Sequence, residues 1–257
     1  MTLIVYCLLI YFVAGISASI TYHRILTHRS VEVVPWFERV LVILALPAGT
    51  PIQWVGTHRQ HHRFTDVEGD PHSPHLFGFW YAHCGWYIQN RNPIVCILYA
   101  LSGPARMLFD GFWRSRTNQQ YNHLAKDLLN KKFFVTVSQP INYATIMTIY
   151  CAAIIVPAYY FWDIKGVITV WIALVLVYNI GDSVNSFAHL YGDTQGSKNQ
   201  SRNNLLLIMF GFGEGWHAHH HAHPSKGVFS EKKPTQDISY FILKTFQFIG
   251  LVKKINK

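Results

Sequence analysis

Charged residues are scarce in this chain, and the features that divide or cross-link many proteins are missing. Aspartate, glutamate, lysine and arginine make up 14% of the 257 residues, against about 25% in a soluble domain. The four cysteines show no CxxC spacing and lie among apolar residues, so we expect reduced packing residues and no disulfide framework. No Ser/Gly-rich linker or internal repeat occurs, so we interpret residues 1–257 as one domain. With half of the residues hydrophobic, the chain is predicted to be an integral membrane protein.

Acidic residues are the rarer charged type. The chain has 13 aspartates and glutamates and 22 lysines and arginines, which gives a formal charge of +9. A basic chain can bind nucleic acid, but basic residues such as Arg24 and Arg29 lie just outside apolar runs. The positive-inside rule gives such residues the role of cytoplasmic topological anchors. We therefore expect membrane lipid, and not nucleic acid, as a partner. A docking surface for an acidic redox protein or carrier is a compatible interpretation.

Apolar segments predict the spans. Residues 2–22, 141–162 and 167–188 are each near the length that crosses a bilayer, and the last two form a helical hairpin. A further apolar stretch near residues 37–54 is broken by prolines and a glycine, which indicates a re-entrant segment. The predicted fold is an all-α integral membrane protein with three to four transmembrane helices, re-entrant and interfacial helices, and a cytoplasmic histidine-rich cap.

Fifteen histidines are present, and most are clustered at the ends of the apolar runs. Three motifs stand out: HRILTH at residues 23–28, HRQHH at 58–62 and GEGWHAHHH at 213–221, while His189 ends the last predicted span. Residues three and four apart share a helix face, so each motif can present several imidazoles to one centre. Such a cluster repels itself when protonated unless a metal organises it, and neutral imidazole binds zinc, copper, iron and nickel.

The number of histidines favours two metal ions. A zinc site needs three or four ligands, whereas about nine well-spaced histidines are present here. The sequence lacks HExxH, and no acidic pairing beside the motifs indicates a carboxylate-bridged di-iron bundle. An all-nitrogen site for two iron ions remains. The predicted hairpin and the broken segment both return the chain to one membrane face, so every motif can reach the same site.

Together the three motifs resemble the HRxxxH, HRxHH and GEGxHxxHH patterns of the membrane fatty acid desaturases, specifically the acyl-CoA (stearoyl-CoA, delta-9) branch. The resemblance runs from about Gly15 to the C-terminus, and bacterial members are the most similar in length. It implies an oxidoreductase that uses O2 and two iron ions to insert a cis double bond, of the delta-9 type, into a saturated acyl chain. The active site would face the cytoplasm, in a bacterial inner membrane or one of the endoplasmic-reticulum type.

The resemblance also implies the ligands, residue by residue. One iron would be bound by His23, His62, His189 and His221, together with a water held by Asn185. The other iron would be bound by His28, His58, His61, His217 and His220. No side chain is expected to act on the substrate as an acid, base or nucleophile, because the chemistry belongs to the metal centre.

One helix face is predicted to line the acyl tunnel. Tyr11, Gly15 and Ser19 recur at four-residue intervals leading to His23, so they share its face. We expect these residues to limit the length of the acyl chain. Trp54 matches an aromatic residue that the family has near its second motif, so we expect Trp54 to line the tunnel as well. Ordinary helix packing through small residues is an equally open interpretation of this spacing.

The sequence departs from the family at positions that bear on the substrate. In the animal acyl-CoA enzymes an Arg-Asp pair precedes the second motif, and a tryptophan lies three residues before the asparagine of NSxxH. Gly56, Thr57 and Asp182 occupy those positions here. The carrier of the acyl chain is therefore open among CoA, acyl carrier protein and lipid. The family usually has four spans, and residues 2–22 correspond to the second.

No HPGG-type cytochrome b5 motif occurs in the sequence. We therefore expect a separate electron donor, which could be cytochrome b5, a ferredoxin or a flavoprotein reductase. Acyl hydroxylases and acetylenases of the same di-iron family share the histidine motifs and remain alternatives. A histidine-rich membrane metal transporter is an alternative from a different class, but it needs polar residues along its spans. A membrane haem protein would leave the tight histidine triplets unexplained.

Overall fold

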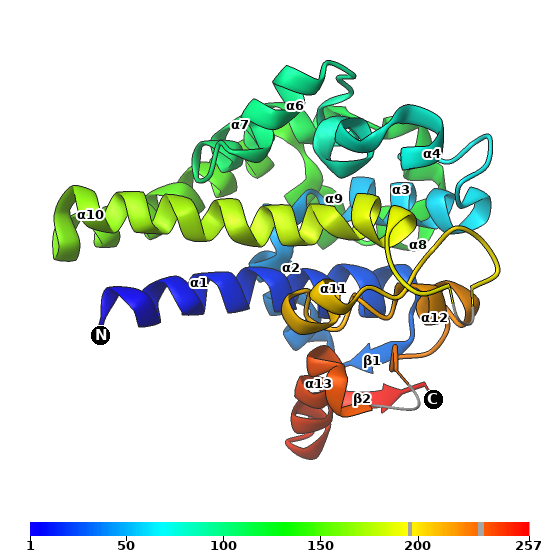
Figure 1. The fold of residues 1–257 in the computed structure, drawn as a ribbon. Helices are drawn as coiled ribbons and strands as arrows, with labels where there is room; N and C mark the ends of the chain where they lie inside the picture. Colours follow the sequence, from blue (N-terminus) through cyan, green and yellow to red (C-terminus); the bar gives the residue numbers. More distant parts are fainter. Residues whose placement is uncertain (195–196, 231–233, 257) are drawn as a thin grey trace.

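The chain folds into a mostly helical protein with one small sheet (Figure 1). The computed structural model describes residues 1–194, 197–230 and 234–256. In chain order the elements are α1 (Leu3–Ser17), η1 (Ala18–Thr27), β1 (Val31–Val33), α2 (Pro35–Ala45), η2 (Leu46–Ala48), α3 (Pro51–Phe64), α4 (Pro74–Phe77), η3 (Tyr81–Gly85), α5 (Trp86–Ile88), α6 (Pro93–Ala100), α7 (Ala105–Trp113), η4 (Arg114–Arg116), η5 (Gln119–Ala125), α8 (Lys126–Leu129), α9 (Lys132–Ser138), α10 (Pro140–Leu190), α11 (Leu205–Phe210), α12 (His217–Ala222), η6 (Pro234–Gln236), α13 (Ile238–Phe248) and β2 (Val252–Ile255). The predicted helical class is confirmed, apart from the short pair of strands.

The first apolar segment forms one long helix. α1 begins after Thr2, whose hydroxyl accepts the backbone N–H of Val5, and it continues into the π-helical η1. The combined helix Leu3–Thr27 is long and apolar enough to cross a membrane. Large apolar side chains such as Leu8 and Phe12 are exposed along it, as a lipid-facing helix requires. The first histidine motif therefore lies at the end of this helix.

The second long apolar element is α10. The sequence predicts separate spans at 141–162 and 167–188, whereas the structure has one element of 51 residues bent at Asp163. A straight helix of that length would be about 75 Å long, more than twice the thickness of a bilayer core. Non-helical angles at Asp163 (φ 51°, ψ −149°) turn the chain. Gly166 then packs against Ala158, where a Cβ would lie 2.2 Å from the carbonyl oxygen, so α10 folds back on itself.

The Pro/Gly-broken segment lies between α2 and α3. Both helices begin at a proline, Pro35 and Pro51, where the missing N–H breaks no helical hydrogen bond. Gly49 between them has φ +126°, and the two helices meet at 75°. In the described part of the chain two helices are long and apolar enough to span a membrane, or three if this bent pair counts as one.

Helix packing gathers the histidine-bearing ends at one end of the molecule. α1 lies beside the second arm of α10, α7 packs against α10, and α3 packs against η1 (Figure 1). The main apolar core lies among η1, α2, α3, α9 and α13. β1 and β2 pair Val31 with Ile255 and Glu32 with Lys254. This pairing holds the C-terminal segment next to the first histidine motif.

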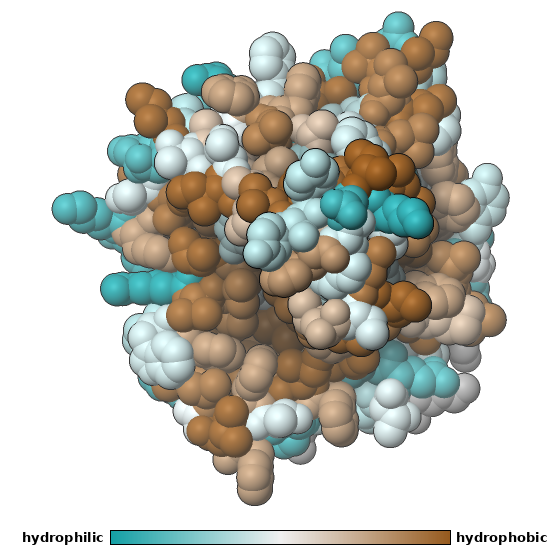
Figure 2. Space-filling view, turned by 90° about the vertical axis from the view of Figure 1, so that its left-hand side faces the viewer, coloured by the Kyte–Doolittle hydropathy of each residue, from teal (hydrophilic) through white to brown (hydrophobic). Residues whose placement is uncertain are grey.

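Apolar side chains cover the end of the molecule that is remote from the histidines. Figure 2 views the end at which α1 begins and α10 turns, and apolar residues spread over much of this face. Ile4, Tyr160, Phe161 and Ile164 are each at least 60% exposed there. Exposed apolar surface of this kind is costly in water and is stabilised by contact with lipid.

Candidate metal centre

Nine histidines from four parts of the chain converge at one end of the helices. η1 carries His23 and is followed by His28, while α10 carries His189 in its last turn. α3 supplies His58, His61 and His62, and α12 supplies His217, His220 and His221. The structure therefore brings together all nine histidines that the sequence nominates as ligands.

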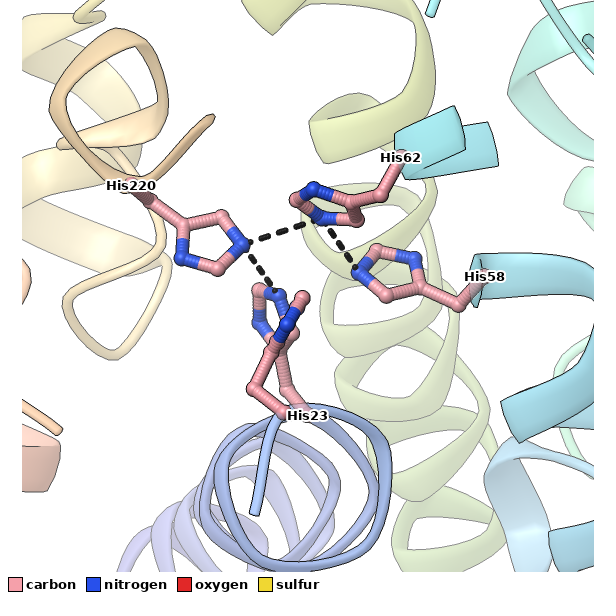
Figure 3. Close-up of side chains that lie close together, drawn as sticks. His23, His58, His62 and His220 are labelled. Carbon is pink, nitrogen blue, oxygen red and sulfur yellow. Dashed lines mark hydrogen bonds between the residues drawn. The ribbon is translucent and has the colours of Figure 1, made fainter. Parts of the chain in front are cut away.

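Five of these histidines form one group. The ligand nitrogens of His23, His28, His58, His62 and His220 all lie within 4.8 Å of one another. His220 Nε2 is 2.8 Å from His23 Nε2 and 3.1 Å from His62 Nε2, which is itself 3.1 Å from His58 Nε2 (Figure 3). The Nε2 atom of a neutral imidazole offers either one N–H or one lone pair, so the three successive contacts cannot all be hydrogen bonds at once. A shared metal ion satisfies all four Nε2 atoms.

The other four histidines form a second group. The ligand nitrogens of His61, His189, His217 and His221 lie within 4.8 Å of one another. His217 Nε2 is 2.9 Å from His189 Nε2 and 3.1 Å from His221 Nε2. His61 Nε2 is buried and has no hydrogen-bond partner among the residues that the structure describes. This orphaned nitrogen also fits a metal ligand.

This five-plus-four division differs from the one that the family resemblance implies. The resemblance places His23 with His189 and His61 with His28, whereas the structure separates both pairs. Helix geometry gives the reason. Histidines four apart, such as His58 and His62, point in nearly the same direction and enter one group. His61 lies three positions after His58, so its side chain points to the other side of the same α3 face and enters the other group.

Carboxylates hold the second nitrogen of several imidazoles. His23 Nδ1 donates to Glu214 at 2.6 Å, and His61 Nδ1 contacts both oxygens of Asp70 at 3.0 Å. His189 Nδ1 donates to Asp66 at 2.7 Å. A hydrogen bond at Nδ1 fixes the tautomer and leaves Nε2 free for a metal. The sequence alone assigns these carboxylates no role, although Glu214 lies within the third motif.

Burial and mutual repulsion keep the third motif neutral. Burial, followed by the charges of neighbouring imidazoles, lowers the pKa of His217, His220 and His221 well below the usual 6.5. Burial raises the pKa of Asp70, but the nearby His61 and His72 outweigh it and lower that pKa. The three histidines therefore act as neutral imidazoles and Asp70 as an ionised carboxylate, which are the protonation states that metal binding requires.

Arg24 is not the surface anchor that its position in the sequence predicts. The guanidinium is fully buried and bonds Glu214 and Asp237, each at 3.0 Å. It also lies 3.6 Å from the centre of the Phe229 ring. Burying a cation is tolerated only when it is paired in this way. Arg24 thus connects the first motif, the third motif and the start of α13.

A partly open cavity of about 130 Å³ leads to the histidines. His23 and His58 line it at the metal end, and so do Gly15, Ser19 and Trp54, three of the four predicted tunnel residues. Trp54 stacks on His58 with ring centres 4.7 Å apart. Most of the exposed wall is apolar, as an acyl chain would require.

Tyr11, the fourth predicted tunnel residue, lies away from the cavity wall. Its hydroxyl donates to the Phe210 carbonyl oxygen at 2.7 Å, and its ring packs against Phe212 at 5.3 Å. The Phe212 ring occupies the space beside Gly15, and it lines the cavity where Tyr11 was expected to do so. Spacing along a helix could not foresee this, because Phe212 comes from a distant turn.

Comparison with known proteins identifies the family of this chain. Residues 1–230 match the family model described as fatty acid desaturase. The chain is 31% identical to the delta-9 acyl-lipid desaturase 1 of Arabidopsis thaliana, over 97% of this chain and 73% of that protein. It is 32% identical to delta-9 acyl-lipid desaturase 2 of the same plant, with 96% and 73% covered. The acyl-CoA C20 delta5-desaturase of Anemone leveillei is 28% identical, with 97% and 72% covered. The family predicted from the histidine motifs is thereby confirmed, and the chain belongs to the fatty acid desaturase family of oxidoreductases.

Proposed function

We propose that this chain is a di-iron desaturase that uses O2 to insert a cis double bond of the delta-9 type into a saturated acyl chain. The observation that carries the proposal is the pair of adjacent histidine groups at the end of an apolar cavity. Two similar proteins of Arabidopsis thaliana named delta-9 acyl-lipid desaturases support the regiochemistry. When bound, the two iron ions would supply the activation of O2 and the oxidation of two adjacent C–H bonds.

The side chains of the protein hold and orient this centre. We assign one iron to the five-histidine group and the other to the four-histidine group, whose further ligand is a water held by Asn185. The carboxylates of Glu214, Asp70 and Asp66 keep the Nδ1 protons in place, so that Nε2 faces the metal. No protein group exchanges a proton with the acyl chain.

The cavity positions the acyl chain and excludes water. Small side chains at Ala14, Gly15 and Ala18 form one wall, and Val177 of α10 belongs to another. An extended methylene chain can lie between them with its reacting carbons beside Trp54 and the histidines. Holding the reacting atoms near the metals replaces a bimolecular encounter by an intramolecular one.

Lipid is our preferred carrier of the acyl chain, ahead of acyl carrier protein and CoA. Gly56 occupies the place of the arginine that animal acyl-CoA enzymes carry before the second motif. A Cβ at Gly56 would lie 2.4 Å from the Tyr121 carbonyl oxygen, so a side chain cannot be added there without moving the backbone. Both similar acyl-lipid enzymes support this choice.

We further propose one domain over residues 1–257, with the bent α10 crossing the membrane twice as a hairpin and the α2–α3 pair as a re-entrant segment. Together with the first helix, this gives three spans plus the re-entrant pair, and a centre that faces the cytoplasm. The membrane would be a bacterial inner membrane or one of the endoplasmic-reticulum type. Electrons would come from a separate cytochrome b5, ferredoxin or flavoprotein reductase.

Expression in a host that lacks delta-9 unsaturated lipids tests the proposal. Mass spectrometry of the acyl chains should show products that have lost two hydrogens, with the double bond at carbon 9. Addition of oxygen would indicate a hydroxylase, and a triple bond an acetylenase. A His217→Ala variant should form no product, whereas His123→Ala, on an exposed contact with the Gln120 carbonyl oxygen, should act as the wild type. Activity retained by His217→Ala would overturn the proposal.

A further inference from the structure

A buried ion pair lies in the wall of the cavity, where the animal acyl-CoA enzymes have a tryptophan. Arg106 of α7 bonds both oxygens of Asp182 in α10, at 2.6 and 3.1 Å. The two residues are 1% and 3% exposed, and both line the cavity. Taking two charges out of water costs about as much as their attraction returns, so such a pair is a poor source of stability. Its place near the metal centre calls for another role.

Tyr87 connects this pair to Asn185. The side-chain nitrogen of Asn185 donates to the Tyr87 hydroxyl at 3.3 Å. Asp182 precedes Asn185 by three residues on α10, so both face the same side. The Tyr87 ring also lies near two guanidinium groups, with Arg114 3.8 Å and Arg106 5.3 Å from the ring centre. Arg106 therefore contacts both Asp182 and Tyr87, and Tyr87 contacts Asn185.

The chemistry of the groups sets the direction of the hydrogen bonds in this chain. A carboxylate that receives two N–H groups from one guanidinium acts as an acceptor, and Arg106 donates to both oxygens of Asp182. Asp182 is therefore the acceptor available to the Tyr87 hydroxyl, beside the Arg106 guanidinium that contacts both residues. Burial, and then the Asp182 charge, raise the pKa of Tyr87, in line with a hydroxyl that keeps its proton. Its oxygen lone pairs remain to accept from the NH2 group of Asn185.

This direction fixes the orientation of the Asn185 amide. With the nitrogen turned to Tyr87, the amide oxygen faces the other way. Asn185 also lies one helical turn before His189, a member of the four-histidine group, on the same face of α10. The oxygen is the atom that can accept a hydrogen bond from a metal-bound water.

We propose that Arg106 and Asp182, acting through the Tyr87 hydroxyl, position Asn185 so that its amide oxygen holds the water on the four-histidine metal. This inference rests on the proposed function and deepens it. Tyr87, Asp182 and Arg106 are positioning residues, since none of them touches the metal. The tryptophan of the animal acyl-CoA enzymes at the Asp182 position cannot perform this task, because an indole offers no acceptor to the tyrosine hydroxyl.

Cobalt binding to the metal-free protein in detergent tests the inference without relying on activity. The wild type should bind two Co²⁺ ions. Tyr87→Phe should weaken one of them by about tenfold, the usual effect of removing an outer partner of a metal ligand. The visible absorption of that cobalt should also intensify, as a site with one ligand fewer becomes closer to tetrahedral. Asn185→Leu should give the same changes, and the double variant should show no further loss.

Tyr99→Phe is the matched control. Tyr99 donates to Asp110 at 2.5 Å within the same ion cluster and lies 4.4 Å from the Arg106 guanidinium, but it has no contact with Asn185 among the described hydrogen bonds. The Tyr99→Phe variant also loses one buried tyrosine hydrogen bond, but it should leave the affinity and spectrum of both cobalt sites unchanged. If Tyr87→Phe does not fold, Asp182→Asn provides the same test, because its amide can reverse the hydrogen bonds at nearly constant shape.

The outcomes separate the two proposals. A wild type that binds fewer than two cobalt ions would refute the proposed two-metal centre itself. A wild type with two ions and a Tyr87→Phe protein that binds both with unchanged affinity and spectrum would refute only the positioning role. Equal losses in Tyr87→Phe and Tyr99→Phe would also refute it, because they would indicate general loosening of the cluster.

Discussion

His62 and His221 stack face to face, with ring centres 4.2 Å apart and planes inclined by 12°. His62 belongs to the five-histidine group and His221 to the four-histidine group. The two rings come from α3 and α12, which are far apart in the sequence. Their contact makes the two groups immediate neighbours, so that two metal ions bound there could act together on one molecule of O2.

Removing either stacked histidine should therefore disable the enzyme in a way that metal analysis can resolve. His62→Ala and His221→Ala should each lower activity by about 100-fold or more and reduce metal content toward one ion per chain. Lipid analysis and metal quantification on the same preparations check this. His123→Ala, outside both groups, should keep two ions. Full metal content and activity in either cluster variant would contradict the assignment of these two ligands.

The carboxylate behind His61 should tune metal affinity. Asp70→Ala removes the acceptor of the His61 Nδ1 proton. The imidazole then loses its fixed tautomer, and metal affinity should fall by about 10- to 100-fold. Competition with a chelator measures this. Glu68→Ala is the control, since Glu68 is exposed and only two residues away. If Asp70→Ala resists the chelator as well as the control does, the contact between Asp70 and His61 does not tune metal affinity.

A side chain at Gly15 should shorten the accepted acyl chain. A Cβ there would lie 1.9 Å from the Phe212 ring, so Gly15→Leu must push this ring into the cavity. Selectivity for shorter over longer substrates should rise by about tenfold or more, the usual effect of one or two methylenes in an apolar site. Product profiles measure the shift. Gly181→Ala, whose Cβ would meet open space, should change the profile little. An unchanged profile in Gly15→Leu would end this account of chain length.

An ion-pair network near the second motif should give stability that depends on pH. Partial burial raises the pKa of Asp127, but hydrogen bonds from Arg59 and Arg29 outweigh it and lower that pKa from 3.8 to about 2. Because the folded pKa is the lower one, the network stabilises the fold above pH 3.8 and loses its effect as pH falls toward 2. Asp127→Asn should lower the unfolding temperature at neutral pH.

Thermal unfolding at several pH values measures this effect. The difference between wild type and Asp127→Asn should shrink as pH falls below 3.8. Glu68→Gln, at an exposed position, should match the wild type throughout. A difference that persists undiminished in acid would mean that the amide disturbs packing and that charge is not the cause.

The sequence predicts that the histidines converge on one site, but it does not predict how they divide into a five-histidine and a four-histidine group. Spacing within each motif is a local property of a helix, so the motifs could be identified from sequence alone. Which metal each histidine faces depends on how α3 and α12 are rotated against each other, and no local pattern encodes that rotation. The i, i+4 relationship of His58 and His62, and of His217 and His221, is the signal that could have indicated the division.

Buried charge is where sequence reasoning is weakest. Arg24 follows an apolar run and so resembles a topological anchor, but its partners Glu214 and Asp237 come from the distant C-terminal part. Arg106 and Asp182 likewise meet only after α7 packs on α10. Tertiary contacts between distant residues decide whether a charge is solvated or paired. The bend of α10 at Asp163, by contrast, is local, and the charged residues that interrupt the apolar run there do predict a turn.

Iron content measured on protein of known activity is the decisive test of the two-metal centre. Fully active protein should hold two iron ions per chain, and activity should be lost when a chelator removes either ion and regained when Fe²⁺ is returned. Full desaturase activity in a preparation that holds fewer than two metal ions per chain would contradict it.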